Sequence, residues 1–429
     1  MLKVNLFQNP NFVSSYKLFL IFIFSTFRFK KKDIMVWIFT PKLLAYEIIF
    51  HKRFALYTTV KLTIFTILFF LITWNSALYS QKVTYNHIVE SLNSDTKKVK
   101  QLFENYISSN PANLKNSKYW SLEEQRSNNK FDFLESEFQP SLYMGLPVHV
   151  LSIKSIHGLY EIKAQFSYCK EDGTPYILAI VNYYAKKENG EFKLFNALSI
   201  NKLDWNCTNL GLVDYYYPKY YHFDIKKAEE LNLFMQKICK NLDVKPKPFE
   251  YYMADDYDEI QTLKGIDYYI GMGGEASPKG KASDNKAYCG GLGENYFHEV
   301  FHVQIDESYP NKHFWVSEGL ATFLGGSRGR ELEWHLKKVN AYLLKHPELN
   351  LNDLLDLKNM DELTSFHYAI GGFLARSIYE KGDWAMIKDF MNSGSEDQNY
   401  YEAIEKYLGI KRTQLNDYLR KEIKASLQK

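Results

Sequence analysis

The chain has 429 residues, enough for two domains with hydrophobic cores, and its 53 Lys and Arg against 50 Asp and Glu give a formal net charge of +3. The charge is uneven, because residues 1–81 hold ten Lys and Arg against Asp33 and Glu47, a net of +8, which leaves 3 − 8 = −5 for residues 82–429. A mildly acidic body argues against nucleic acid as a partner.

Residues 1–81 are predicted to be a signal or anchor leader. Residues 62–81 carry no formal charge and begin with an apolar run, and basic residues precede them. This order is typical of a secretory signal, although some sixty residues come before the run. The leader is either cleaved near Ser80 or kept as a signal anchor, and we favour cleavage. In both cases the basic flank predicts that residues 82–429 are exported, as a periplasmic, secreted or membrane-anchored protein that contacts the membrane only through this segment.

Residues 82–214 are predicted to form an α+β module. Apolar residues at helical spacing predict a helix over Asn86–Ser109, with Asp95 as an acidic exception on its apolar side. Alternating apolar and polar residues, separated by Asp172-Gly173 and Glu188-Asn189-Gly190, then predict an antiparallel meander. Its strands are Pro147–Ile153, Tyr160–Tyr168, Tyr176–Lys186 and Glu191–Leu203. On pattern alone this module resembles the nuclear-transport-factor-like fold, and it carries no reactive constellation.

Residues 215–429 are predicted to form the second domain. Its first elements are a helix from Asp224 to Lys240, strands at Pro246–Met253 and Ile266–Ile270, and a short helix near Asp256–Leu263. Further helices are expected to the end of the chain. They are Glu331–Leu344, one beginning near His367, Asp397–Leu408 and Arg412–Ser426.

The four cysteines lack the Cys-x-x-Cys spacing of zinc sites. They are Cys169, Cys207, Cys239 and Cys289. Two interpretations stay open: disulfides Cys169–Cys207 and Cys239–Cys289, which would fit export, or four free thiols.

The segment Phe297–His302 carries the pattern His-Glu-x-x-His. On a helix, His298 and His302 lie one turn apart on the same face, so both imidazoles can bind one Zn²⁺. Glu299 lies around the helix from this pair and can instead take a proton from water beside the metal. A catalytic zinc also needs a third protein ligand.

Glu318 is the best candidate for that third ligand. The break at Tyr309-Pro310-Asn311 lets a first helix end and a second one return with the carboxylate. Gly319 and Ala321 are small, so we expect the second helix to lie close against the first. Asp306, one turn past the second histidine, is the reserve ligand or an outer support of the site.

His298, Glu299, His302, Glu318 and the following Gly-x-Ala resemble the gluzincin metallopeptidases, which have a peptidase-MA-like domain and include thermolysin and the zinc aminopeptidases. The resemblance covers about the last half of the chain. It implies a thermolysin-like domain with a small sheet and a mainly helical C-terminal half, a Zn²⁺ cofactor, and a peptide or protein substrate. The chain as a whole is therefore predicted to be an α+β protein.

The resemblance also assigns roles around the metal. An edge strand just before the zinc helix, near Tyr288, would pair with the substrate backbone. Tyr368 resembles the residue that donates to the oxyanion of the tetrahedral intermediate, and His367 is the alternative donor. With Glu299 as the proton carrier, the resemblance implies hydrolysis of peptide bonds.

Two departures from the family bear on specificity. The gap from His302 to Glu318 is shorter than in the large gluzincin families, and Gly271–Glu275 is a poor copy of the aminopeptidase motif. An endopeptidase is therefore slightly favoured, although endo and exo cleavage both stay open. The alternatives are a zinc hydrolase of a non-peptide amide and a non-catalytic extracellular binding protein with a structural zinc. Glu299 argues against the latter, since a structural site needs no base.

Overall fold

The computed structural model describes residues 83–87, 93–109, 118–127, 147–274, 277–357 and 359–428. The chain divides into two compact units, Met1–Tyr79 and Ser80–Lys429, and the description below concerns the second. The predicted leader lies outside the described residues. In the described part of the chain, no helix combines the length and apolarity needed to cross a bilayer.

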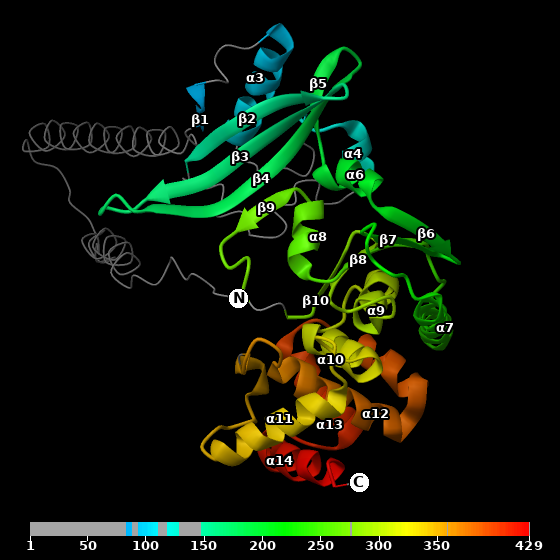
Figure 1. Cartoon of the computed structure of the whole chain (residues 1–429). Helices are drawn as coiled ribbons and strands as arrows, with labels where there is room; N and C mark the ends of the chain where they lie inside the picture. Colours follow the sequence, from blue (N-terminus) through cyan, green and yellow to red (C-terminus); the bar gives the residue numbers. More distant parts are fainter. Residues whose placement is uncertain are drawn as a thin grey trace, which may run out of the picture. The chain divides into compact units, whose positions relative to one another are not determined.

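Within those residues the protein is mixed α+β, with two mixed sheets and many helices (Figure 1). Sheet A has the order β1 (Val83–Tyr85), β2 (Val148–Ile156), β3 (Leu159–Cys169), β4 (Pro175–Glu188) and β5 (Glu191–Phe195), and β9 (Ile266–Tyr269) also pairs with β4. The β1–β2 pair is parallel, whereas the other neighbours are antiparallel. The predicted meander is therefore confirmed from β2 to β5.

The turns of this meander form as their sequences predict. Asp172 accepts a hydrogen bond from the backbone N–H of Thr174 at 2.9 Å, and Asn189 and Gly190 take the positive φ that a tight hairpin requires. The last predicted strand is too long, because β5 ends at Phe195. Asn196 then caps a short helix, α6 (Ala197–Asn201), which leads into a 3-10 helix at Lys202–Asp204.

Helix α3 (Ser94–Ser108) packs on one face of sheet A, and α4 (Leu122–Ser127) follows it. The predicted start at Asn86 is wrong: the Asn93 side chain accepts from the Thr96 N–H at 2.9 Å and caps the helix there. Residues 83–85, just before the predicted start, instead pair with β2. Asp95 avoids the apolar face and bonds to Lys187 at 2.8 Å.

Sheet B has the order β10 (Lys279–Ser283), β11 (Lys286–Gly290), β8 (Phe249–Ala254), β7 (Val213–Tyr217) and β6 (Asn206–Leu210). The outer pairs are antiparallel and the inner pairs are parallel. The predicted domain boundary between residues 214 and 215 falls inside β7, since the β6–β7 hairpin belongs to sheet B. The division into an N-terminal module and a metallopeptidase domain stays a prediction.

The two faces of sheet B differ. On one face the rings of Tyr216, Tyr252 and Tyr288 stack, with centroids 5.0 and 5.3 Å apart, and α8 (Tyr257–Leu263) packs there. The main core covers the other face, where α7 (Ile225–Asn241) and α9 (Phe297–Ile305) lie. The helix predicted from Asp224 is confirmed, because the Asp224 side chain caps α7.

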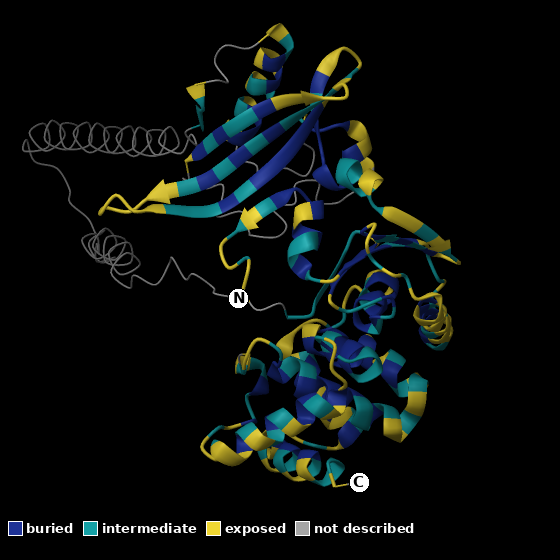
Figure 2. Ribbon diagram, viewed as in Figure 1, coloured by how far each residue is buried: buried dark blue, intermediate teal, exposed yellow. Residues whose placement is uncertain are grey.

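The C-terminal helices complete this core, and Figure 2 shows their buried inner faces. They are α10 (Phe314–Gly325), α11 (Leu332–Lys345), α12 (Phe366–Met391), α13 (Asp397–Leu408) and α14 (Leu415–Ser426), with 3-10 helices at Asp306–Ser308, Leu354–Asp356 and Arg412–Gln414. Non-helical backbone at Gly382 and Asp383 kinks α12. All four cysteines are free thiols; Cys239 and Cys289 are buried, and Cys169 and Cys207 are exposed.

Candidate metal centre

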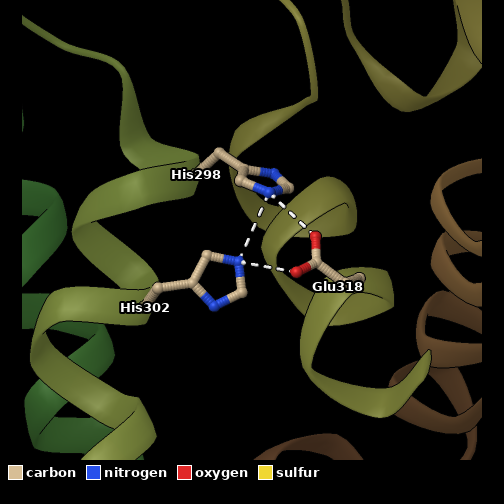
Figure 3. A group of neighbouring side chains, drawn as sticks. All are labelled: His298, His302 and Glu318. Carbon is tan, nitrogen blue, oxygen red and sulfur yellow. Dashed lines mark hydrogen bonds and ion pairs between the residues drawn. The ribbon is translucent and has the colours of Figure 1, made fainter. Parts of the chain in front are cut away.

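Two consecutive helices bring His298, His302 and Glu318 together (Figure 3). Helix α9 carries both histidines, and α10 returns with the carboxylate after the break that the sequence predicts. The turn ends at His313, whose Nδ1 accepts a hydrogen bond from the Trp315 N–H at 3.1 Å and caps α10. Glu318 thereby lies in the second turn of its helix and faces α9.

The three donor atoms are spaced as metal ligands are. The His298 and His302 Nε2 atoms lie 3.3 Å apart, and the Glu318 oxygens lie 3.2 Å from the first and 3.6 Å from the second. Tetrahedral zinc, with bonds of roughly 2.0–2.2 Å, places neighbouring ligand atoms about 3.3–3.5 Å apart. The group therefore fits Zn²⁺ in both donor chemistry and spacing.

The opposite nitrogen of each ring has its own partner. His298 Nδ1 lies 2.7 Å from the Gly326 carbonyl oxygen, so it must donate. His302 Nδ1 lies 3.1 Å from the Asp306 carboxylate and donates in the same way. Both Nε2 atoms of the neutral rings then carry lone pairs, and these face each other and a carboxylate. The two lone pairs and the carboxylate repel one another unless a cation lies between them.

This geometry also separates Asp306 from the ligand group. Its carboxylate lies on the outer side of the His302 ring, accepts from Ser317 Oγ at 3.0 Å and pairs with Lys312 at 3.1 Å. The Asp306 side chain is therefore not placed to be the third ligand. It supports the ring from outside, the other role that the sequence allowed.

The charges of the group are tightly coupled. Burial opposes protonation of the His302 ring, but the Glu318 and Asp306 carboxylates raise its pKa well above the usual value. Burial likewise opposes ionisation of Glu318, yet His302 and His298 hold the pKa of that carboxyl well below the usual value. Without a metal, a proton on His302 would occupy the group, so metal and proton compete.

Glu299 lies beside the group in a pocket of about 270 Å³, named here the His–His–Glu pocket. Gly280, Lys281 and Ala282 of β10 form its edge, and Tyr368 also lines it. Burial raises the pKa of Glu299. The strand can come so close because residue 280 is glycine: a Cβ there would lie 2.6 Å from Glu299 Oε1.

The predicted oxyanion donors occupy different positions. Tyr368 lines the His–His–Glu pocket, and its ring centroid lies 5.8 Å from that of His298. Burial raises the Tyr368 pKa, so its hydroxyl keeps the proton that a donor needs. His367 packs against Trp315 and lies 2.9 Å from Ser365 Oγ, and it does not line the pocket. The geometry favours Tyr368 over His367.

Sequence reasoning missed Arg328, whose positive charge lies near Tyr368 and works against the rise in the pKa of that hydroxyl. Arg328 has a φ of 52° in a tight turn between Ser327 and Arg330, and its N–H is bonded to the Tyr296 hydroxyl at 3.0 Å. A positive φ is costly for an arginine, which points to a functional position. The following Gly329 signals the turn, but no sequence signal shows that the turn reaches the site.

The small residue after Glu318 serves a different contact from the one predicted. Gly319 faces α12, where an added Cβ would lie 2.5 Å from the Gly371 backbone. The predicted close approach of α10 to α9 instead occurs at Gly325, next to the backbone of His298. Gly371 makes the same close approach from the other side, since an added Cβ there would lie 3.1 Å from the Trp315 carbonyl oxygen of α10. Helix α12 thus fixes α10, and with it Glu318, from behind.

Comparison of the sequence with known proteins adds no family to this picture. No protein-family model matches the chain, and no curated protein is significantly similar to it. The gluzincin resemblance therefore stays a prediction, and the candidate centre rests on its own geometry.

Proposed function

We propose that the protein is an exported zinc-dependent peptidase of the gluzincin type. One observation carries the proposal: two Nε2 lone pairs and a carboxylate face each other at 3.2–3.6 Å, beside a buried glutamate that is not part of the group. The first feature calls for a divalent cation, and the second provides a proton carrier. A structural metal site has no use for that carrier.

His298, His302 and Glu318 would hold the zinc. The ion, when bound, would polarise the substrate carbonyl and make water more acidic. Glu299 would accept a proton from the attacking water and pass it to the leaving amine. Tyr368 would donate to the developing oxyanion.

An extended peptide is favoured over a small amide by the strand beside the site. Among the described residues β10 pairs only with β11, so one backbone edge of β10 is open, and its residues 280–282 line the His–His–Glu pocket. A substrate strand could pair along this edge and pass Glu299. The predicted position of the edge strand at Tyr288 is wrong, because Tyr288 lies in β11 between β10 and β8. The role belongs to β10.

The finer architecture is part of the same proposal. Sheet B, with its antiparallel edge strand, and the helix pair α9–α10 support a thermolysin-like domain. Helix α3 on the meander supports a nuclear-transport-factor-like module. Export follows from the predicted leader. Fractionation with N-terminal sequencing would test export, and a full-length protein in the cytoplasm would contradict it.

The decisive experiment is Glu299→Gln, with peptide-library cleavage and metal analysis on the same preparation. We expect turnover to fall about 1,000-fold or more while zinc content is unchanged, because the amide cannot carry the proton. Glu307→Gln is the matched control, since Glu307 lies just after α9 and is 80% exposed. A zinc-loaded wild-type protein that cleaves no peptide would instead indicate a structural metal or a different amide substrate.

A further inference from the structure

A second polar pocket, of about 500 Å³, lies on sheet A. Ile162 and Ala164 of β3 belong to the core that includes α3, so the alternating Glu161 and Lys163 lie on the opposite face. We call this cavity the sheet A pocket. Its lining residues come from β3, β4, β9, α8, α6 with the segment that follows it, and the segment after β7. They include Glu161, Lys163, Asn182, Tyr184, Asp204, Trp205, Tyr220, Glu259 and Asp267.

The pocket has an excess of negative charge. Four carboxylates line it against one lysine, and Lys163 is already paired with Asp267 at 2.6 Å. Glu161, Asp204 and Glu259 therefore have no cation within the lining. Burial raises the pKa of Glu259, and the nearby Asp256 and Asp255 add to this, although a hydrogen bond from Tyr220 opposes it.

The pocket also has an unmatched acceptor. Asn182 is 9% exposed and donates through Nδ2 to Asp267 at 2.7 Å. Its Oδ1 atom is buried and has no hydrogen-bond partner among the described residues. A buried acceptor without a donor costs about 1–3 kcal/mol. The carboxylates around it can only accept, so they cannot provide the missing donor.

Aromatic rings complete the lining. Tyr184 is buried and donates to Asn201 at 3.1 Å, whereas Trp205 is partly exposed and Tyr220 is 53% exposed. Rings beside carboxylates suit an organic cation, which gains from both the charge and the ring faces. A metal ion fits less well. In the part of the chain that the structure describes, only one group of three or more His, Cys, Asp or Glu side chains is close enough together to hold a metal ion. That group is His298, His302 and Glu318.

We propose that the sheet A pocket binds an organic cation, a protonated amine or guanidinium of the kind carried by Lys and Arg side chains and by polyamines. The ligand provides positive charge to balance the excess of carboxylates in the lining. Its recognition is independent of the metal group, because the two pockets share no lining residue.

The test is calorimetric titration of the purified full-length chain with Nα-acetyl-arginine amide and with Nα-acetyl-citrulline amide, in which a neutral urea replaces the guanidinium. We expect saturable binding of the arginine probe that weakens with added salt, and at least about tenfold weaker binding of the citrulline probe. Nα-acetyl-lysine amide and spermidine are the further arms. Tighter binding of spermidine would identify a polyamine as the ligand, and tighter binding of the amides would identify a peptide side chain.

Two variants place this binding in the pocket. Glu161→Gln and Asp204→Asn keep the size of each side chain but remove one charge, and each should weaken the arginine probe about three- to tenfold. Glu171→Gln, in the exposed turn between β3 and β4, is the matched control and should leave binding unchanged. Thermal unfolding midpoints verify that each variant is folded. The proposal is overturned if no cation binds, if citrulline binds equally well, or if neither pocket variant weakens binding.

Discussion

The His–His–Glu pocket and the sheet A pocket are both polar, but their polar atoms are held in different ways. In the first, each histidine is fixed through its outer nitrogen, by Asp306 or by the Gly326 carbonyl, and the inner atoms converge. In the second, carboxylates surround a wider space, and Tyr220 and Asp204 are exposed. Bond-making chemistry needs atoms fixed to within fractions of an ångström, whereas cation binding needs mainly a field of the right sign.

The largest effect is expected when one of the three proposed zinc ligands is replaced. Glu318→Gln should lower zinc affinity about 1,000-fold or more and abolish peptide cleavage with it, because an amide is a poor ligand for zinc. Asp306→Asn should cost only about tenfold, since it weakens an outer support. Competition with a chelator measures both affinities. If Asp306→Asn stripped the zinc and Glu318→Gln did not, the gluzincin proposal would fall.

A second test disturbs the contact between α10, which carries Glu318, and α12. Gly319→Ala should destabilise the fold by about 2–3 kcal/mol, since the new Cβ would lie 2.5 Å from the backbone of α12. Gly371→Ala is the matched variant: its Cβ would lie 3.1 Å from the Trp315 carbonyl oxygen, and we expect a loss below about 1.5 kcal/mol. Urea unfolding measures both. Equal losses would show that the crossing of α10 and α12 is looser than the structure indicates.

Tyr368→Phe sharpens the contrast within the His–His–Glu pocket, because it removes a donor and leaves the ligands in place. We expect kcat to fall about 10- to 100-fold, with zinc content and KM little changed, since the hydroxyl would act on the transition state. Steady-state kinetics on one cleaved peptide provides the values. His367→Asn is the comparison, and a larger loss of kcat in that variant would move the donor role to His367.

The smallest effect concerns pH, through a histidine that lies outside both pockets. Burial lowers the pKa of His367 to about 4 from the usual 6.5. Between these values the unfolded chain binds a proton that the folded chain does not, so stability falls as the pH drops from about 6.5 to 4. From pH 7 to 5 the loss should be about 1–2 kcal/mol. Urea unfolding of His367→Asn should show a flatter pH dependence than the wild type, and His222→Asn, at an exposed position, is the control.

The elements that sequence predicts well are those defined by local contacts. The hairpin turns at Asp172 and Asn189, the cap at Asp224 and the spacing of His298 and His302 are all local, and each structure follows from residues a few positions apart. Glu318 could be named because the break before α10 is also local.

The features that sequence missed depend on distant contacts. Strand β1 pairs with β2, whose first residue is 65 positions further along the chain, and nothing near Val83 indicates this pairing. The sequence predicts the edge strand at Tyr288 and not at β10, because the order of strands in a sheet is not encoded in any one of them. Arg328 lies near Tyr368 of α12, and Gly319 meets the backbone of α12; both are contacts between residues far apart in the sequence.

The two ring supports differ in how substitution can reach them. Asp306 is a side chain, so a single substitution can change the basicity of the His302 ring and, with it, the acidity of water at a bound metal. The support of His298 is a backbone carbonyl, which every residue type supplies. Point mutations, natural or engineered, can therefore change the properties of the site through His302. His298 keeps its orientation as long as the turn after α10 keeps its backbone conformation.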